Sequence, residues 1–63
     1  MTITKYIVAR TAKEASKFWN SDLCHDSRND AQEYLNRCKL VAPGSYSNDV
    51  IFRCMLHVEA VAQ

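Results

Sequence analysis

The hydrophobic positions at the C-terminal end of the chain alternate with the period of a β-strand. One parity of residues 50–61 is apolar throughout: Val50, Phe52, Cys54, Leu56, Val58 and Ala60. The other parity is mixed: Ile51, Arg53, Met55, His57, Glu59 and Val61. This alternation predicts a strand with one face in the core and one amphipathic face outside. At about 3.3 Å per residue the strand is long for a small protein, so we expect part of it to pair beyond the monomer.

A helical stripe precedes this strand. Apolar residues recur at the i, i+3, i+4, i+7 spacing of one helix face: Ala31, Tyr34, Leu35 and Cys38. Ser27 is a typical N-cap residue, and Asp30, three residues later, places an acid in the positive first turn. Pro43 disfavours helical geometry at the residue before it and Gly44 permits a turn, so we expect the helix to end there.

Residues 2–11, TITKYIVART, are rich in β-branched and aromatic side chains and predict another strand. Ile3 and Ile7 fall on one face of this strand, whereas Tyr6 and Val8 fall on the other. A strand that is apolar on both faces is either central in its sheet or covered on both sides. We therefore expect it to have neighbours.

Residues 12–22, AKEASKFWNSD, fit two different structures. In a helix, Thr11 is the cap with Glu14 at the third position, and Trp19 shares a face with two alanines. In a strand, Phe18 and Trp19 point to opposite faces, and NSD forms a turn. Propensity slightly favours the helix, whereas the need for a third strand favours the hairpin, because two isolated strands are marginal.

These elements predict an α+β fold with a small antiparallel sheet packed on one main helix. The favoured order is ββαβ, and β-α-α-β is the alternative. The 63 residues make one small domain, residues 1–63, and a chain of this length buries only about 60 % of the surface that its unfolded form exposes. Small domains usually add a disulfide, a metal or a second subunit, so we expect a homodimer.

Charge and cysteine usage narrow the class of protein further. The net charge is +1, with basic residues concentrated in residues 1–20 and acidic residues in 21–36, which permits an anionic partner without requiring nucleic acid. Three widely spaced cysteines without a C-x-x-C pair are a poor disulfide framework. No signal-peptide pattern is visible, and no apolar run approaches the roughly 20 residues of a membrane helix. We expect a reduced, cytoplasmic protein that does not contact the membrane.

The stretch SDLCHDSRND raises the question of a metal site or a reactive thiol. Zinc needs about four converging ligands, and the candidates are Cys24, His25, Cys38, Cys54 and His57. In a strand, Cys54 and His57 are three residues apart and point to opposite faces. Cys38 and Cys54 occupy apolar positions, where a free cysteine packs as a small hydrophobe. Cys24 and His25 remain alone in a linker without an oxyanion hole or a substrate wall. We expect no metal site, no catalytic residue and no cofactor.

The exterior offers two candidate binding surfaces. The outward parity of the last strand carries Arg53, Met55, His57 and Glu59, and arginine and methionine are enriched in protein interfaces. A solvated strand face with cross-strand ion pairs explains the same residues equally well. The alternative surface combines basic and aromatic residues of the N-terminal third, Lys5, Lys13, Lys17 and Trp19, which together are typical of single-stranded nucleic-acid binding. Packing of the aromatic residues in a small core competes with that second interpretation.

Four stretches follow one another along the chain: KYIVART, KFWNS, DSRNDAQEYL and DVIFRCMLHVEA. In layout and size, this order resembles that of the short accessory proteins encoded in the early regions of tailed bacteriophages and prophages. The resemblance covers most of the chain and includes no diagnostic motif, so it assigns a role to no individual residue. It implies a protein of the host cytoplasm that binds host or phage proteins governing replication, transcription, or the choice between lysis and lysogeny. We therefore expect a non-enzymatic regulatory protein that acts by stoichiometric binding, with a small nucleic-acid-binding regulator as the alternative.

Overall fold

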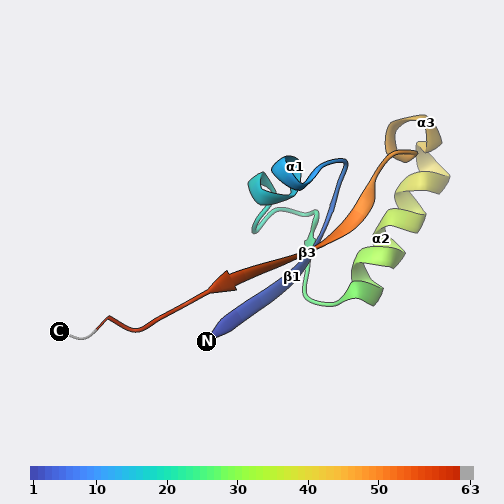
Figure 1. The fold of residues 1–63 in the computed structure, drawn as a ribbon. Helices are drawn as coiled ribbons and strands as arrows, with labels where there is room; N and C mark the ends of the chain where they lie inside the picture. The colour runs from blue at the N-terminus through green and yellow to red at the C-terminus, as the bar shows by residue number, and fades with distance from the viewer. Residues whose placement is uncertain (62–63) are drawn as a thin grey trace.

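The computed structural model describes residues 1–61, which form three strands and three helices (Figure 1). In chain order the elements are β1 (Thr2–Ala9), α1 (Ala12–Lys17), β2 (Cys24–His25), α2 (Arg28–Val41), α3 (Pro43–Tyr46) and β3 (Val50–His57). The strands form one antiparallel sheet in the order β2-β1-β3, so β1 is central. The α+β fold with a small antiparallel sheet packed on one main helix is confirmed.

Helices cover both faces of the sheet. On one face, Ile7 and Ala9 of β1 are buried against Ala15 of α1, and half-buried residues complete the cluster: Phe18, Trp19, Leu23, Cys24, Phe52 and Cys54. On the other face, Val8 is buried against Ala31 and Leu35 of α2. Figure 1 shows α1 and α2 on opposite sides of the β1–β3 pair. The expectation that the first strand has neighbours is confirmed, and the strand is both central and covered on its two faces.

The favoured position of the second strand is wrong. Residues 12–17 form helix α1, in which the Thr11 hydroxyl accepts a hydrogen bond from the Glu14 N–H at 3.2 Å. The second strand is instead β2, a two-residue segment in which Cys24 pairs with Ile7 and His25 with Tyr6. A third strand is thus present, as the sheet required, but it is supplied by the linker before α2.

Helix α2 begins and ends where the sequence predicts. The Ser27 hydroxyl accepts from the Asp30 N–H at 3.1 Å, and the helix ends at Val41 before the extended residue Ala42. Pro43 then begins the short helix α3, which no sequence pattern indicated. Proline suits the first position of a helix because its missing N–H would have no helical partner there.

The last strand is shorter than predicted, since β3 ends at His57 and residues 58–61 have no regular secondary structure. Phe52 and Cys54 lie in the core as predicted. Other members of the expected core parity are exposed: Val50, Leu56, Val58 and Ala60. Ile51, on the expected outer parity, instead packs against the Val8–Leu35 cluster. Helix α2 covers the face of β3 that carries Ile51, whereas Val58 and Ala60 lie past the end of the strand.

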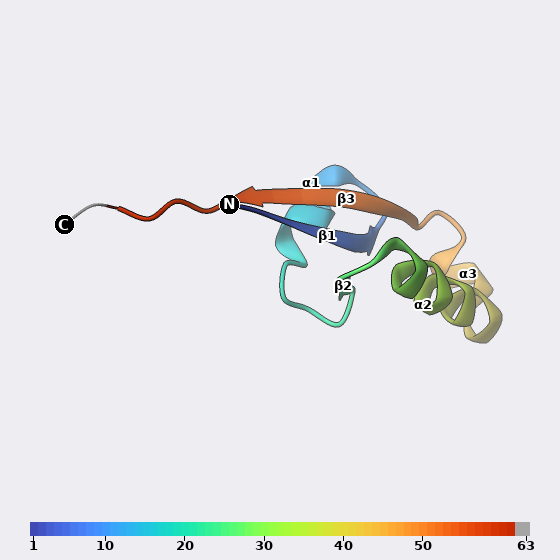
Figure 2. The ribbon, with the colours of Figure 1, turned by 90° about the horizontal axis from the view of Figure 1, so that it is seen from below.

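The molecule is elongated, with dimensions of 51 × 21 × 14 Å and a radius of gyration of 13.5 Å. A compact domain of this length has a radius of gyration of about 11 Å. The start of β1 and the end of β3 project away from α2 and α3, and the N-terminus and residues 58–61 lie at that end (Figures 1 and 2). We call this projection, residues 1–4 and 55–58, the ribbon end.

Candidate functional site

The outer edge of β3 has no neighbouring strand in the part of the chain that the structure describes. The Val8 N–H donates to the Leu23 carbonyl at 3.1 Å, so Val8 directs its backbone groups toward β2. Backbone groups alternate along an antiparallel strand, and Ile7 therefore directs its groups toward Phe52 of β3. By the same alternation, four residues of β3 direct their backbone N–H and C=O groups away from β1: Ile51, Arg53, Met55 and His57. We call these four residues the outer edge.

Three of the four residues predicted as a protein-binding surface belong to this outer edge. Arg53 lies opposite Tyr6, Met55 opposite Thr4 and His57 opposite Thr2, so their side chains share the sheet face that carries α2. Met55 is 64 % exposed. Glu59, the fourth residue, lies past the strand, and its carboxylate is 2.9 Å from Nε2 of His57.

The opposite face of the ribbon end is apolar and exposed. Leu56 is 46 % and Val58 is 37 % exposed, beside Met1 at 77 %. The Met1 amino group donates to the Val58 carbonyl at 2.9 Å, and the Val58 N–H donates to the Met1 carbonyl at 2.7 Å. The pairing of the first and last strands thus continues beyond β3 and holds this apolar face in place.

The residues predicted for nucleic-acid binding come from β1, from α1 and from the segment that follows α1. Trp19 is half-buried in the cluster of Ile7, Ala9 and Ala15. Lys5 is ion-paired with Asp26, and this hydrogen-bonded contact raises the pKa of the lysine and lowers that of the carboxyl. Lys13 and Lys17 are exposed on α1. Trp19, the aromatic member of the set, packs against the core and also lines a hollow beside α1.

The cysteines and histidines lie apart. Cys54 contributes to the core cluster, and burial raises the pKa of its thiol. Cys24 and His25 are consecutive in β2, so they point to opposite faces, and the His25 ring lies 5.0 Å from that of Tyr34 on α2. Cys38 lines a shallow hollow at the end of α2. No three His, Cys, Asp or Glu side chains within residues 1–61 converge as metal ligands would.

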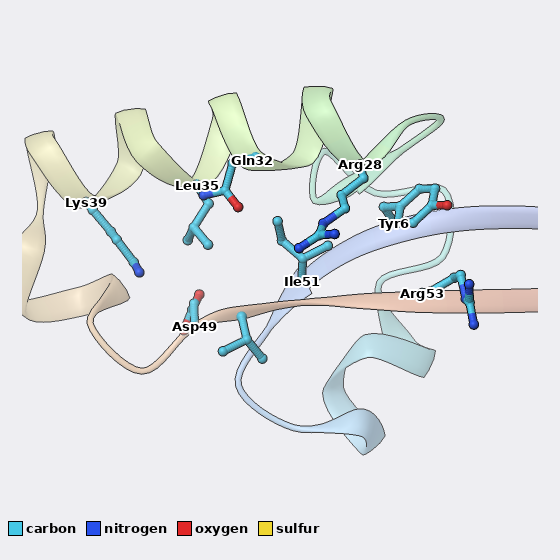
Figure 3. Close-up of a pocket in the computed structure, with 9 residues that line it drawn as sticks. Tyr6, Arg28, Gln32, Leu35, Lys39, Asp49, Ile51 and Arg53 are labelled. Atoms are coloured by element: carbon cyan, nitrogen blue, oxygen red, sulfur yellow. The ribbon is translucent and has the colours of Figure 1, made fainter.

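A groove of about 670 Å³ lies between α2 and β3 (Figure 3). Residues of α2 form one wall: Arg28, Gln32, Leu35 and Lys39. Ile51 and Arg53 of the outer edge line the other side, and Tyr6 and Asp49 also contribute. The sequence reasoning missed this groove. Its signal is a second helical stripe, the i, i+4, i+7, i+11 spacing of the four α2 residues, beside the apolar stripe.

Comparisons with models of protein families, with curated proteins and with solved structures found no match. None of the helices formed by residues 1–61 is long and apolar enough to cross a membrane. Residues 62 and 63, the end of the predicted single domain, lie outside the described residues.

Proposed function

We propose that this protein has no catalytic activity and acts by stoichiometric binding of another protein through the outer edge of β3. The observation that carries the proposal is the row of outward backbone groups at Ile51, Arg53, Met55 and His57, which no described strand satisfies. An open edge of this kind is a template for an added strand from another chain.

Features that normally blunt an exposed edge are scarce in β3. Its sequence, VIFRCMLH, contains neither proline nor lysine, and Arg53 is its one permanently charged residue. Natural sheets usually protect an edge strand with such residues, with a bulge, or with a covering loop or helix. The composition of β3 therefore favours pairing over protection.

The ribbon end supports self-association as part of the same proposal. Its exposed apolar face carries Met1, Leu56 and Val58. A second copy that covers these side chains would bury apolar surface that a single small core leaves in water. Sedimentation equilibrium at high micromolar concentration is expected to show a dimer, and a strict monomer contradicts this part of the proposal.

The resemblance to accessory proteins of tailed phages places the partner among host or phage proteins that govern replication, transcription or lysogeny. That placement, and the host cytoplasm as the location, are part of the proposal and depend on the resemblance alone. The edge mechanism is independent of them.

Replacing Met55 with proline tests whether the partner adds as a strand to the outer edge of β3. Met55→Pro removes an outward N–H and leaves the hydrogen bonds between β1 and β3 intact, because proline is tolerated where the strand N–H faces solvent. Met55→Thr is the matched control, since it shortens the same side chain and keeps the N–H. Tagged protein is used to capture partners from a host lysate, with recovery measured per mole of bait.

We expect Met55→Pro to lose a partner that the wild type and Met55→Thr both retain in a fixed molar ratio. Circular dichroism of the three proteins checks that the fold is kept. Equal recovery by the proline and threonine variants contradicts the proposed function.

A further inference from the structure

We infer that the groove between α2 and β3 binds an extended acidic segment of the partner, which adds to the outer edge of β3 as a strand. This inference rests on the proposed function and names the chemistry of the segment. The observations that carry it are the charges of the groove, its length, and the direction of the backbone groups beside it.

The groove has an excess of positive charge. Arg28, Lys39 and Arg53 line it, and none of them is ion-paired with another residue among those the structure describes. Asp49 is the acidic residue of the lining, and its carboxylate already lies 3.3 Å from the Arg10 guanidinium. The unpaired cations therefore favour a ligand that carries carboxylates.

The cations of α2 are spaced for an extended ligand. Figure 3 shows the side chains of Arg28 and Lys39 extending from α2 toward β3. They are eleven residues apart in the helix, which corresponds to about 16 Å along its axis. An extended chain covers that distance in about five residues. A segment with carboxylates near both ends of such a stretch reaches both cations.

The outward backbone N–H and C=O groups beside the groove favour a peptide strand as the ligand. Ile51 and Arg53 line the groove and direct their N–H and C=O groups outward. A strand added there points every second side chain toward α2, because strand side chains alternate between the faces. An acidic residue at every second position is therefore the pattern that meets Arg28 and Lys39, while Leu35 and Ile51 supply an apolar floor.

Two other occupants fit the groove less well. Single-stranded nucleic acid uses aromatic platforms for stacking, and Tyr6 is the one aromatic residue of the lining. A second copy of the chain would bring its own β3, whose charged residue is again an arginine, next to the basic wall. Residues 58–61 leave from the opposite end of the molecule (Figure 1).

The test uses synthetic eight-residue peptides and fluorescence anisotropy at low and physiological salt. The probe alternates Glu and Val, and its matched controls replace Glu with Gln or with Lys. A thymidine octanucleotide tests the nucleic-acid alternative. Arg28→Gln/Lys39→Gln removes charges of the groove, and Lys13→Gln/Lys17→Gln removes the same number of charges from α1. Arg53→Gln and Arg53→Pro differ chiefly in the outward N–H.

We expect the Glu/Val peptide to bind the wild type and the α1 variant equally, and the groove variant at least about 10-fold more weakly, as the loss of two charge-assisted contacts requires. Binding is expected to weaken with added salt, and Arg53→Pro is expected to lose more affinity than Arg53→Gln. The Gln/Val and Lys/Val peptides and the oligonucleotide are expected to bind at least about 10-fold more weakly than the probe.

Any of four results overturns the inference: no binding of the Glu/Val peptide at millimolar concentration, equal binding by the groove variant, a Gln/Val or Lys/Val peptide as tight as the probe, or tighter binding of the oligonucleotide. Two further outcomes distinguish a failure of the acidic preference from a failure of strand addition. If neutral and acidic peptides bind alike and Arg53→Pro abolishes both, strand addition stands and the acidic preference fails. If Arg53→Pro binds every peptide as Arg53→Gln does, strand addition at this edge fails as well.

Discussion

Ile7 and Val8 are consecutive residues of β1, and both are completely buried, in two different clusters on opposite faces of the sheet. Ile7 packs against α1 and Val8 packs against α2. The central strand therefore joins two half-cores, each too small to be stable alone. This relationship is the basis of the first prediction.

Removing one methyl group from Ile7 is expected to destabilise the protein more than the same change at Ile3. Ile7→Val leaves a small cavity in a closed cluster and is expected to cost about 1 kcal/mol. Ile3 is half-buried on the same face of β1, so Ile3→Val is expected to cost less than about 0.5 kcal/mol. Urea unfolding followed by circular dichroism measures both. Equal losses would show that the ribbon end is packed as tightly as the centre of the sheet.

The cap of α2 predicts a second effect on stability. Ser27→Ala removes the hydroxyl that accepts from the Asp30 N–H, and loss of such a cap costs about 1 kcal/mol. Ser47→Ala, at an exposed residue after α3, is the matched control and is expected to change the free energy of unfolding by less than about 0.5 kcal/mol. If the two substitutions have the same effect in urea titrations, the cap contributes nothing.

The ion pair of Lys5 and Asp26 predicts a dependence of stability on pH. The pKa of Asp26 is lowered from its ordinary value of 3.8 by Lys5, so its contribution is present above that value and is lost as the pH falls through the folded pKa. The pKa of Lys5 is raised from 10.5 by the same contact, so its contribution is present below 10.5 and is lost at higher pH.

Asp26→Asn is therefore expected to be less stable than the wild type between about pH 5 and pH 9, and the difference is expected to vanish toward pH 2. The Asp26 side chain is exposed and that of Lys5 is half-buried, so added salt is expected to reduce the difference. The urea midpoints of the two proteins are compared at each pH, with Asp22→Asn as the control for loss of an acidic residue. A difference that persists unchanged at pH 2 would assign the effect to something other than this pair.

Burial of Cys54 predicts that its thiol reacts slowly in the folded protein. In the variant Cys24→Ser/Cys38→Ser, Cys54 is the one thiol, and its pKa is raised from 9.0 by burial. The thiolate is the reactive form, so Ellman's reagent at pH 8 is expected to modify the folded protein much more slowly than the same protein in urea. The rate in the folded state is expected to keep rising above pH 9. Equal rates in the folded and unfolded states would show that the thiol is accessible and outside the core.

Much of the fold could be predicted because the signals are local. The Ser27 cap and the stripe from Ala31 to Cys38 lie within one helix, and the alternation of Phe52 and Cys54 lies within one strand. Thr11 and Glu14 also carried a local helix signal, and the favoured hairpin was wrong because it placed the third strand in the wrong segment. Strand β2 contains two residues and exists because they pair with Tyr6 and Ile7, so no periodic pattern could reveal it.

In the candidate site, too, the sequence predicted what lies within one strand and missed what depends on contacts between elements. Alternation along residues 50–61 was enough to group Arg53, Met55, His57 and Glu59, because every second residue of a strand lies on the same face. Alternation along one strand could not reveal the groove, because Arg28 and Lys39 share a helical stripe and only the packing of α2 against β3 brings that stripe beside Arg53. Sequence pattern thus specifies which side chains share a face of one helix or strand. Which faces meet, which edge stays open and which charges gather at it follow from packing between residues far apart in the chain, and no local periodicity records that packing.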